Sequence, residues 1–284
     1  MIIDFHTHIF PPDICQNREA FFRFEPAFEL LYESSKSRLI GAIELLDVMD
    51  ENEVDKSVIL GFPWKNSEIC KMHNDHIMEM VQKYPHRFIG LGCFDLSTNH
   101  TLAETERCLD GGLAGIGELA FYQAGIDESA LDQLAPIMKI CADCDLPVMI
   151  HTNEPVGHAY HGKTPITLAQ IYRLIRRFSE TKIVLAHWGG GLFFYSLMKR
   201  DVKEALTNVF FDTAASPFLY DSEIYRFAVK LLGVDKILFG SDYPLLPPSR
   251  YFGEMSEAGL TKPQIDKICG GNAKTLLKLS GKQG

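Results

Sequence analysis

The stretch MIIDFHTH (residues 1–8) joins a short apolar run to two histidines, His6 and His8, separated by one residue. The apolar run, residues 1–5, predicts a β-strand, and residues i and i+2 of a strand lie on the same side. His6 and His8 can therefore face one point, where two neutral imidazoles suit a divalent cation. A strand that ends in two incidental polar residues explains the same pattern, so this stretch leaves both interpretations open.

Seven further apolar runs of strand length follow, with helical patterns between them. They cover residues 56–62, 88–94, 113–119, 146–152, 182–187, 209–214 and 236–242. Near-continuous apolar strands that alternate with helices indicate a parallel sheet, and eight such units predict an α/β fold, the closed (β/α)8 TIM barrel. A doubly wound sheet is the alternative. It is weakened because no G-x-G-x-x-G follows the first strand and no Walker sequence occurs.

The length of 284 residues suits one α/β barrel, so we expect a single domain over residues 1–284. Residues 9–55 form a long insertion after the first strand, which exceeds a simple crossover. A lid over the barrel mouth, an oligomer contact and additional core are all compatible with its aromatic composition. The tail, TKPQIDKICGGNAKTLLKL (261–279), predicts two short helices separated at Gly270 and Gly271.

Charge and composition limit the classes of molecule that the protein is expected to bind. The formal charge of −9 and the lack of a basic run argue against a nucleic-acid-binding protein. No signal peptide or membrane span is recognisable, and the seven cysteines suit reduced thiols rather than a disulfide framework. We therefore expect a cytoplasmic protein with a small-molecule partner and neither a nucleic-acid nor a membrane partner. A homodimer is left open.

Residues of metal-ligating type end five of the eight predicted strands. They are His6 and His8 after the first strand, Glu118 after the fourth, His151 after the fifth, His187 after the sixth and Asp242 after the eighth. In a TIM barrel the active site lies at the C-terminal ends of the strands, so these side chains are expected in one layer. The sequence therefore predicts a metal centre at that end of the barrel.

Four motifs carry a resemblance to a known family. DFHTH (4–8), MIHTNEP (149–155), LAHWGGG (185–191) and LFGSDYP (238–244) resemble the amidohydrolase superfamily. The most similar branch includes aminocarboxymuconate-semialdehyde decarboxylase, resorcylate-type decarboxylases and several lactone and amide hydrolases. The resemblance extends from residue 2 to about residue 275. It is specific for the fold and the metal site and says little about the substrate.

The resemblance implies a role for each ligand candidate. His6, His8 and His151 are implied as metal ligands, and His187 as a ligand of a second metal or a group that acts on the substrate. Asp242 is implied as a metal ligand and as the general base. Mixed nitrogen and carboxylate ligands suit Zn²⁺, with Mn²⁺ or Fe²⁺ as alternatives.

Glu118 departs from the pattern of the decarboxylases, which usually hold one metal and need no carboxylate at the fourth strand. Two-metal hydrolases of the superfamily use a glutamate there. A bridging Glu118 would allow a second cation, whereas a Glu118 that only orients a ligand would accompany a single ion.

The loop HTNEPVGHAYHGK (151–163) is rich in polar residues, so we expect His158, His161 or Lys163 to contact the substrate. Solvent or a neighbouring subunit is the alternative environment for these side chains. Trp188, directly after His187, is expected as an apolar wall of the site unless strand alternation turns it toward the helices.

Three functions remain compatible with these residues. The favoured one is a metal-dependent hydrolase of a small, carboxylate-bearing amide, lactone or ester that uses a metal-activated water. The alternative is a metal-dependent, non-oxidative decarboxylase of an aromatic or muconate-type acid. The third, a catalytically inactive barrel that binds a partner, is opposed by the intact ligand set.

Overall fold

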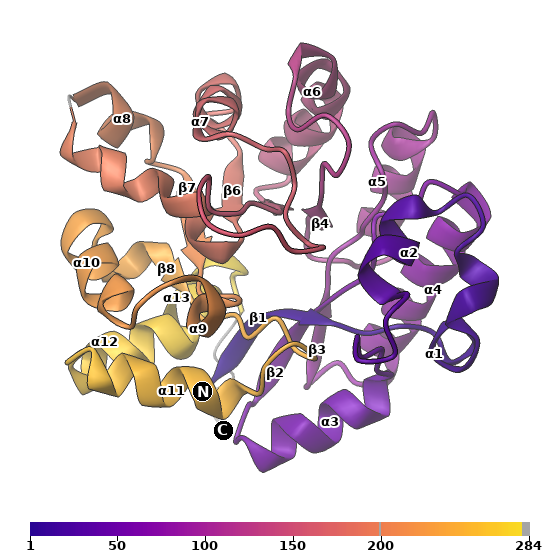
Figure 1. Cartoon of the computed structure of the whole chain (residues 1–284), viewed down its shortest axis with the longest axis horizontal. Helices are drawn as coiled ribbons and strands as arrows, with labels where there is room; N and C mark the ends of the chain where they lie inside the picture. Colours follow the sequence, from indigo (N-terminus) through magenta and orange to yellow (C-terminus); the bar gives the residue numbers. More distant parts are fainter. Residues whose placement is uncertain (199, 280–284) are drawn as a thin grey trace.

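The computed structural model describes residues 1–198 and 200–279 and shows a barrel of parallel strands surrounded by helices (Figure 1). The strands are β1 (Ile3–His8), β2 (Lys56–Leu60), β3 (Phe88–Gly90), β4 (Ile116–Leu119), β5 (Pro147–Ile150), β6 (Lys182–Leu185), β7 (Val209–Asp212) and β8 (Ile237–Leu238). Two sheets, β1–β3 and β4–β8, contain all of them. Parallel bridges from Thr7 to Tyr243 and from Gly92 to Ile116 join the sheets and close the barrel. The predicted TIM barrel is confirmed.

Helices cover the outside of the barrel. The main ones are α3 (Ala42–Glu51), α4 (Ser67–Lys83), α5 (Thr101–Asp110), α6 (Glu128–Asp143), α7 (Leu168–Arg177), α8 (Arg200–Ala205), α10 (Glu223–Leu232) and α11 (Pro248–Glu257). In α7, Ile171, Leu174 and Ile175 are buried at helical spacing, whereas Arg173 and Arg177 form ion pairs on the outer side. None of the described helices combines the length and hydrophobicity that crossing a bilayer requires.

The hydrophobic core has two layers. One fills the barrel interior with side chains from many strands, among them Ile3, Phe5, Val58, Leu60, Met149, Val184 and Leu238. The other lies between the strands and the helices. Because the interior is filled, a polar site can lie only at an end of the barrel.

The insertion, residues 9–55, contains α1 (Pro12–Gln16), a 3₁₀ turn η1 (Arg18–Phe21), α2 (Pro26–Tyr32) and α3. Phe28 of α2 is buried, and its ring lies 5.3 Å from that of Phe62 and 4.5 Å from that of Trp64. Both partners follow β2, so α2 packs beside the C-terminal end of the barrel. Part of the insertion is therefore additional core. The lid and the oligomer contact stay predictions.

The tail does not break at its glycines. A single π-helical segment, η4 (Lys267–Gly271), connects α12 (Lys262–Asp266) to α13 (Asn272–Leu276). The expected separation at Gly270 and Gly271 is therefore wrong. A Cβ atom at Gly270 would collide with the carbonyl oxygen of Met1, so the glycine allows the tail to approach the start of β1 closely.

The buried histidine His73 of α4 should make the stability of the protein depend on pH. It is buried, accepts a hydrogen bond from Trp64 Nε1 at 2.9 Å, and donates one to the Ile9 carbonyl at 2.8 Å. Burial lowers the pKa of His73 to about 3 from an ordinary value of 6.5, so only the unfolded chain takes up this proton between those values. The free energy of unfolding should therefore fall by up to about 1.4 kcal/mol per pH unit as the pH drops through this window.

Urea denaturation of the protein and of His73→Gln between pH 7 and pH 4 measures this contribution. We expect the variant to be less stable at pH 7 and to lose stability less steeply on acidification. Parallel curves for the two proteins would contradict the assignment to His73.

Candidate metal centre

The six predicted ligand residues lie together at the C-terminal end of the barrel. They come from β1 (His6, His8), β4 (Glu118), the residue after β5 (His151), the start of the 3₁₀ segment η2, His187–Leu197 (His187), and the loop after β8 (Asp242). They form three overlapping groups whose ligand atoms lie within 4.8 Å of one another. We call these six residues the His/carboxylate cluster.

Two strand irregularities turn ligands toward the cluster. Between Asp4 and Thr7, β1 contains one residue more than the paired segment of β2. Between Ile116 and Leu119, β4 likewise contains one residue more than β5. Such a bulge interrupts the alternation of side chains and re-aims one of them. Hence Phe5 fills the barrel interior while His6, the next residue, joins the cluster, and Glu118 is aimed in the same way.

Five of the six distances among His6 Nε2, His8 Nε2, Asp242 Oδ1 and Glu118 Oε2 are close to those expected around one ion. His6 Nε2 lies 3.1 Å from His8 Nε2 and 3.4 Å from Asp242 Oδ1, and His8 Nε2 lies 3.5 Å from the same oxygen. Glu118 Oε2 lies 3.5 Å from His6 Nε2 and 3.8 Å from His8 Nε2. Atoms bound about 2.1 Å from a metal lie about 3.0 Å apart at right angles and about 3.4 Å apart at the tetrahedral angle.

The hydrogen bonds of the two imidazoles direct their lone pairs to this point. His6 Nδ1 donates to Asp212 Oδ2 at 2.8 Å, and His8 Nδ1 donates to the Gly61 carbonyl at 3.3 Å. Burial lowers the pKa of His6, but Glu118 and Asp212 outweigh it and raise that pKa well above its ordinary value. Lone pairs and carboxylates thus face one point that favours positive charge, and the donor set fits a divalent metal ion.

Glu118 has a second oxygen, which faces the other two histidines. His151 Nδ1 lies 2.9 Å from Oε1, and His187 Nε2 lies 3.5 Å from it. Burial raises the pKa of Glu118, but His6 and His151 outweigh it and hold that pKa well below its ordinary value. The second nitrogen of His151 lies 3.0 Å from the Gly162 carbonyl, so both ring nitrogens of His151 already contact protein acceptors.

Asp212, at the end of β7, organises the cluster and was missed in the sequence. It is fully buried, and besides holding His6 it accepts hydrogen bonds through Oδ1 from the backbone N–H of His187 at 2.8 Å and of Ala214 at 3.1 Å. His187 and Asp242 have left-handed backbones, with φ of 54° and 59°. Such strain often occurs at functional sites, where neighbouring contacts hold it. A carboxylate near the end of the seventh predicted strand, residues 209–214, was the available signal.

Asp212→Asn should weaken Mn²⁺ binding by about 10- to 100-fold, because the amide no longer orients His6 as a carboxylate does. Calorimetric titration with Mn²⁺ measures the effect. The control is Asp143→Asn, an exposed residue of α6 that pairs with Lys139. Equal affinity of Asp212→Asn and the parent protein would show that Asp212 does not support the metal ligand.

The predicted substrate-binding side chains are placed differently from the ligands. Lys163 is paired with Glu154 at 2.7 Å, and His158 and His161 are exposed. Trp188 is fully buried and donates from Nε1 to Ser216 Oγ at 2.9 Å, on the helix side of β6. The structure therefore does not bring Trp188 to the cluster. The contact that this loop makes with the cluster is the backbone carbonyl of Gly162.

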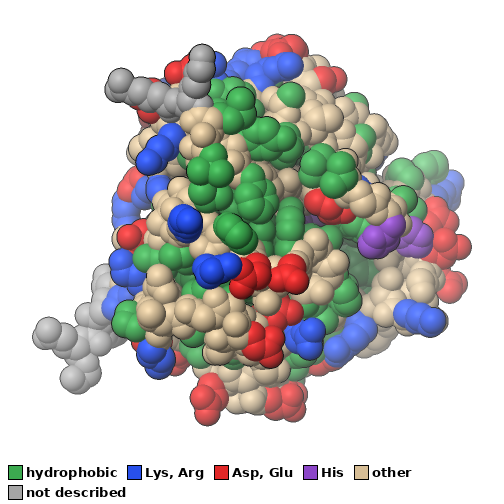
Figure 2. Space-filling model, turned by 60° about the vertical axis from the view of Figure 1, so that its left-hand side comes forward, with side chains coloured by type: hydrophobic (Ala, Val, Ile, Leu, Met, Phe, Trp, Pro, Cys, Tyr) green, Lys and Arg blue, Asp and Glu red, His purple; other side chains and the backbone are tan. Residues whose placement is uncertain are grey.

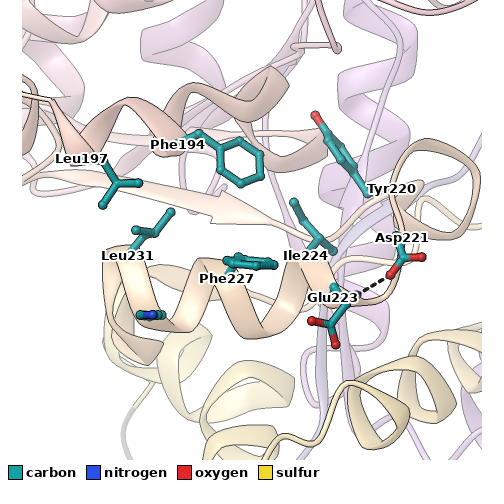
Figure 3. Close-up of a pocket in the computed structure, with 9 residues that line it drawn as sticks. Phe194, Leu197, Tyr220, Asp221, Glu223, Ile224, Phe227 and Leu231 are labelled. Atoms are coloured by element: carbon teal, nitrogen blue, oxygen red, sulfur yellow. Dashed lines mark hydrogen bonds between the residues drawn. The ribbon is translucent and has the colours of Figure 1, made fainter.

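An apolar groove of about 430 Å³ lies elsewhere, between η2 and α10 (Figure 3). Its lining includes Phe194, Leu197, Ile224, Phe227 and Leu231. Hydrophobic side chains gather on this side of the molecule, near α8 and α10 (Figure 2). Large apolar pockets are common binding sites, yet no residue of the His/carboxylate cluster lines this one. We place the chemistry at the cluster, because ionisable and metal-ligating groups converge there.

Comparison with known proteins relates the fold and the cluster to a family. Residues 3–279 match the profile of the family described as Amidohydrolase. The 2-amino-3-carboxymuconate-6-semialdehyde decarboxylase of Dictyostelium discoideum is 27% identical over 251 residues, which cover 75% of this chain and 67% of that protein.

Solved structures agree in fold. The 5-carboxyvanillate decarboxylase of Sphingomonas paucimobilis superposes with a TM-score of 0.78 at 18% identity, covering 99% of both chains. The dihydroxybenzoic acid decarboxylase of Polaromonas sp. JS666, with bound manganese and the inhibitor 2-nitroresorcinol, gives a TM-score of 0.71 at 19% identity, covering 98% of this chain and 97% of that one.

These comparisons correct the favoured function. The expectation of a hydrolase of a small amide, lactone or ester is wrong, because the similar proteins named above are decarboxylases of aromatic or muconate-type acids. The strand-end residues do not distinguish a hydrolase from a decarboxylase, because both reaction classes use a divalent metal in the same fold. The alternative function, a decarboxylase, is the better supported one.

Proposed function

The chain belongs to the amidohydrolase family, and from this premise we propose that it is a metal-dependent, non-oxidative decarboxylase of a small aromatic or muconate-type acid. The observation that carries the proposal is the similarity to a curated aminocarboxymuconate-semialdehyde decarboxylase over 75% of the chain. The ligand spacing of the His/carboxylate cluster supports it, because it suits one ion at the mouth of the barrel.

In this proposal His6, His8, Asp242 and Glu118 Oε2 hold one divalent ion. His151 and His187 hold the other oxygen of Glu118 and thereby orient it. Mn²⁺ is the ion we propose, with Zn²⁺ and Fe²⁺ as competitors, because the related dihydroxybenzoic acid decarboxylase contains manganese. When bound, the ion supplies positive charge that orients the oxygens of the acid and stabilises charge that develops on them.

Decarboxylation replaces a carbon–carboxylate bond by a carbon–hydrogen bond, so CO₂ leaves and one proton enters at the same carbon. The Asp242 side chain is 17% exposed and the His8 side chain 16%, whereas those of Glu118 and His6 are 9% and 0% exposed. The cluster is therefore open on the side of Asp242. We assign to the Asp242 carboxylate the transfer of the proton, which it takes up from solvent at the open side and passes to the carbon that loses CO₂, and to Glu118 and His187 the holding of the cluster behind it.

The proposal treats residues 1–284 as one catalytic domain in which the insertion, residues 9–55, forms one side of the mouth. His158, His161 and Lys163 stay candidates for contacts with the acid. The homodimer stays a prediction that the mass of the protein in solution tests.

Release of CO₂ tests the function. The Mn²⁺-loaded protein is incubated with 2,6-dihydroxybenzoate, 5-carboxyvanillate and 2-amino-3-carboxymuconate 6-semialdehyde, and the metal-free protein serves as the control. We expect CO₂ from at least one acid, with equimolar formation of the decarboxylated product, and none without metal. The absence of CO₂ from all three acids with a fully loaded protein would overturn the proposal.

Glu118→Gln tests the number of ions. With one ion, the parent protein and the variant should each bind one equivalent of Mn²⁺, and the variant should bind it more than about 10-fold more weakly, because an anionic ligand is lost. Glu154→Gln, which changes a carboxylate paired with Lys163, is the matched control. A second equivalent that the parent binds and Glu118→Gln does not would make Glu118 a bridge between two ions.

A further inference from the structure

Two tyrosines from distant parts of the chain lie on either side of Phe62, near the His/carboxylate cluster. Phe62, which follows β2, lies between them: its ring is 6.1 Å from that of Tyr32 and stacks at 6.5 Å on that of Tyr122. Tyr122 follows β4, and its ring lies 6.1 Å from the imidazole of His151. The barrel thereby holds Tyr122 beside His151 of the cluster, and Phe62 connects it to Tyr32 of the insertion.

Tyr32 is held firmly in this position. Its ring lies 5.3 Å from that of Phe10 and 4.9 Å from that of Phe28, both of which are fully buried. Its carbonyl oxygen accepts a hydrogen bond from Arg18 at 3.3 Å. A side chain fixed by three aromatic neighbours loses little further freedom on binding a ligand, which favours a positioning role.

Neither phenol uses its hydroxyl within the protein. Across residues 1–198 and 200–279 no hydrogen bond involves the hydroxyl of Tyr32 or Tyr122, and neither oxygen belongs to the buried polar atoms that lack a partner. Both hydroxyls are therefore donors that the described part of the chain leaves without an acceptor. Burial and the carboxylates of Asp242 and Glu118 raise the pKa of both phenols above its ordinary value, so both stay protonated at neutral pH.

The nearby cations offer no equivalent donor. Lys163 is paired with Glu154, and the Arg38 guanidinium contacts Glu44 at 2.5 Å and the Tyr243 hydroxyl at 3.1 Å. Among the described residues, the two neutral phenols are thus donors that have no partner within the protein. Neutral donors suit a hydroxyl or phenolate oxygen on a ring better than a second carboxylate, which would require a cation.

We propose that Tyr32 and Tyr122 are positioning residues that donate hydrogen bonds to hydroxyl substituents on the ring of the acid, while Phe62 and the Tyr122 ring flank it. This assignment rests on the proposed function, because it concerns the same site. It favours hydroxylated monocarboxylic aromatic acids over dicarboxylic ones.

Binding of 2-nitroresorcinol tests the assignment without turnover, because this probe keeps two ring hydroxyls and has no carboxylate to lose. Calorimetry on the Mn²⁺-loaded protein should show about 3- to 10-fold weaker binding for Tyr32→Phe and for Tyr122→Phe, as expected for one lost hydrogen bond each. Tyr172→Phe, on α7, is the matched control. Mn²⁺ content and Tm should equal those of the parent in all three variants.

Turnover separates this inference from the proposed function. On 2,6-dihydroxybenzoate the two Phe variants should raise KM with little change in kcat. Release of CO₂ by the parent together with parent-like binding and KM in both variants would overturn the inference and leave the function standing. If the parent protein releases no CO₂ but both variants bind the probe more weakly than the parent, the inference would be upheld and the proposed function overturned. A loaded parent that does not bind the probe would overturn the inference.

Discussion

Replacing His6 and His8 together by Ala should leave the protein without bound metal and lower kcat/KM by about 10³-fold or more. The two Nε2 atoms lie 3.1 Å apart, and both Nδ1 atoms are engaged by acceptors, so the pair contributes two preoriented lone pairs. Without them, two carboxylates remain as ligands, which bind a transition metal far more weakly. A bound ion contributes several kcal/mol to a reaction of this kind, and each 1.36 kcal/mol or so corresponds to a tenfold rate change.

Elemental analysis of the purified double variant and its rate of CO₂ release, measured with and without added Mn²⁺, test this prediction. His86→Ala removes an exposed histidine between α4 and β3 and should change neither quantity. A double variant that retains parent-like activity after metal removal would contradict a metal-dependent reaction. Full metal content with lost activity would place the ion elsewhere.

Asp242→Asn should lower kcat by about 10²- to 10⁴-fold, the usual contribution of a proton-transferring side chain, and change KM little. The amide has nearly the shape of the carboxylate but cannot take up and release the proton. The left-handed backbone at Asp242, with φ of 59°, persists in the variant because Asn is among the residues that tolerate this region. Asp242→Ala would be less informative, because it would remove the proton-transferring group and also disfavour the left-handed backbone at this position.

Steady-state kinetics over a range of pH, together with Mn²⁺ titration, measure the effect. Asp143→Asn on the exposed face of α6 is the control and should behave like the parent. A loss shared equally between kcat and KM, accompanied by loss of Mn²⁺, would show that Asp242 serves as a ligand only. An unchanged kcat would assign the proton transfer to another group.

The fold was predictable because its determinants are local. Each strand is a short apolar run, since a barrel strand is buried on both faces, and the eight runs alternate with amphipathic helices such as α7. The ends of these runs placed His6, His8, Glu118, His151, His187 and Asp242 in one layer, and the structure brings them together. Strand limits were less predictable, as β3 and β8 are much shorter than their apolar runs.

Other features of the site depend on contacts between residues far apart in the sequence. Asp212 holds His6 across 206 positions of the chain, and no local pattern distinguishes it from another strand-end carboxylate. Trp188 adjoins His187, yet its left-handed backbone, with φ of 61°, turns it toward Ser216 and the helices. Tyr32 lies in an insertion whose path over the barrel cannot be derived from composition.

The residue types and their order were therefore sufficient for the barrel, the end at which the His/carboxylate cluster lies, and the residue types that form it, because periodicity and strand ends are properties of neighbouring residues. The orientation of the cluster side chains, in contrast, depends on tertiary packing. The bulges in β1 and β4, the left-handed backbones at His187 and Asp242, and the carboxylate of Asp212 turn the side chains to one point. Each of these features is stabilised by a partner on another strand, and such partners become neighbours only when the barrel closes.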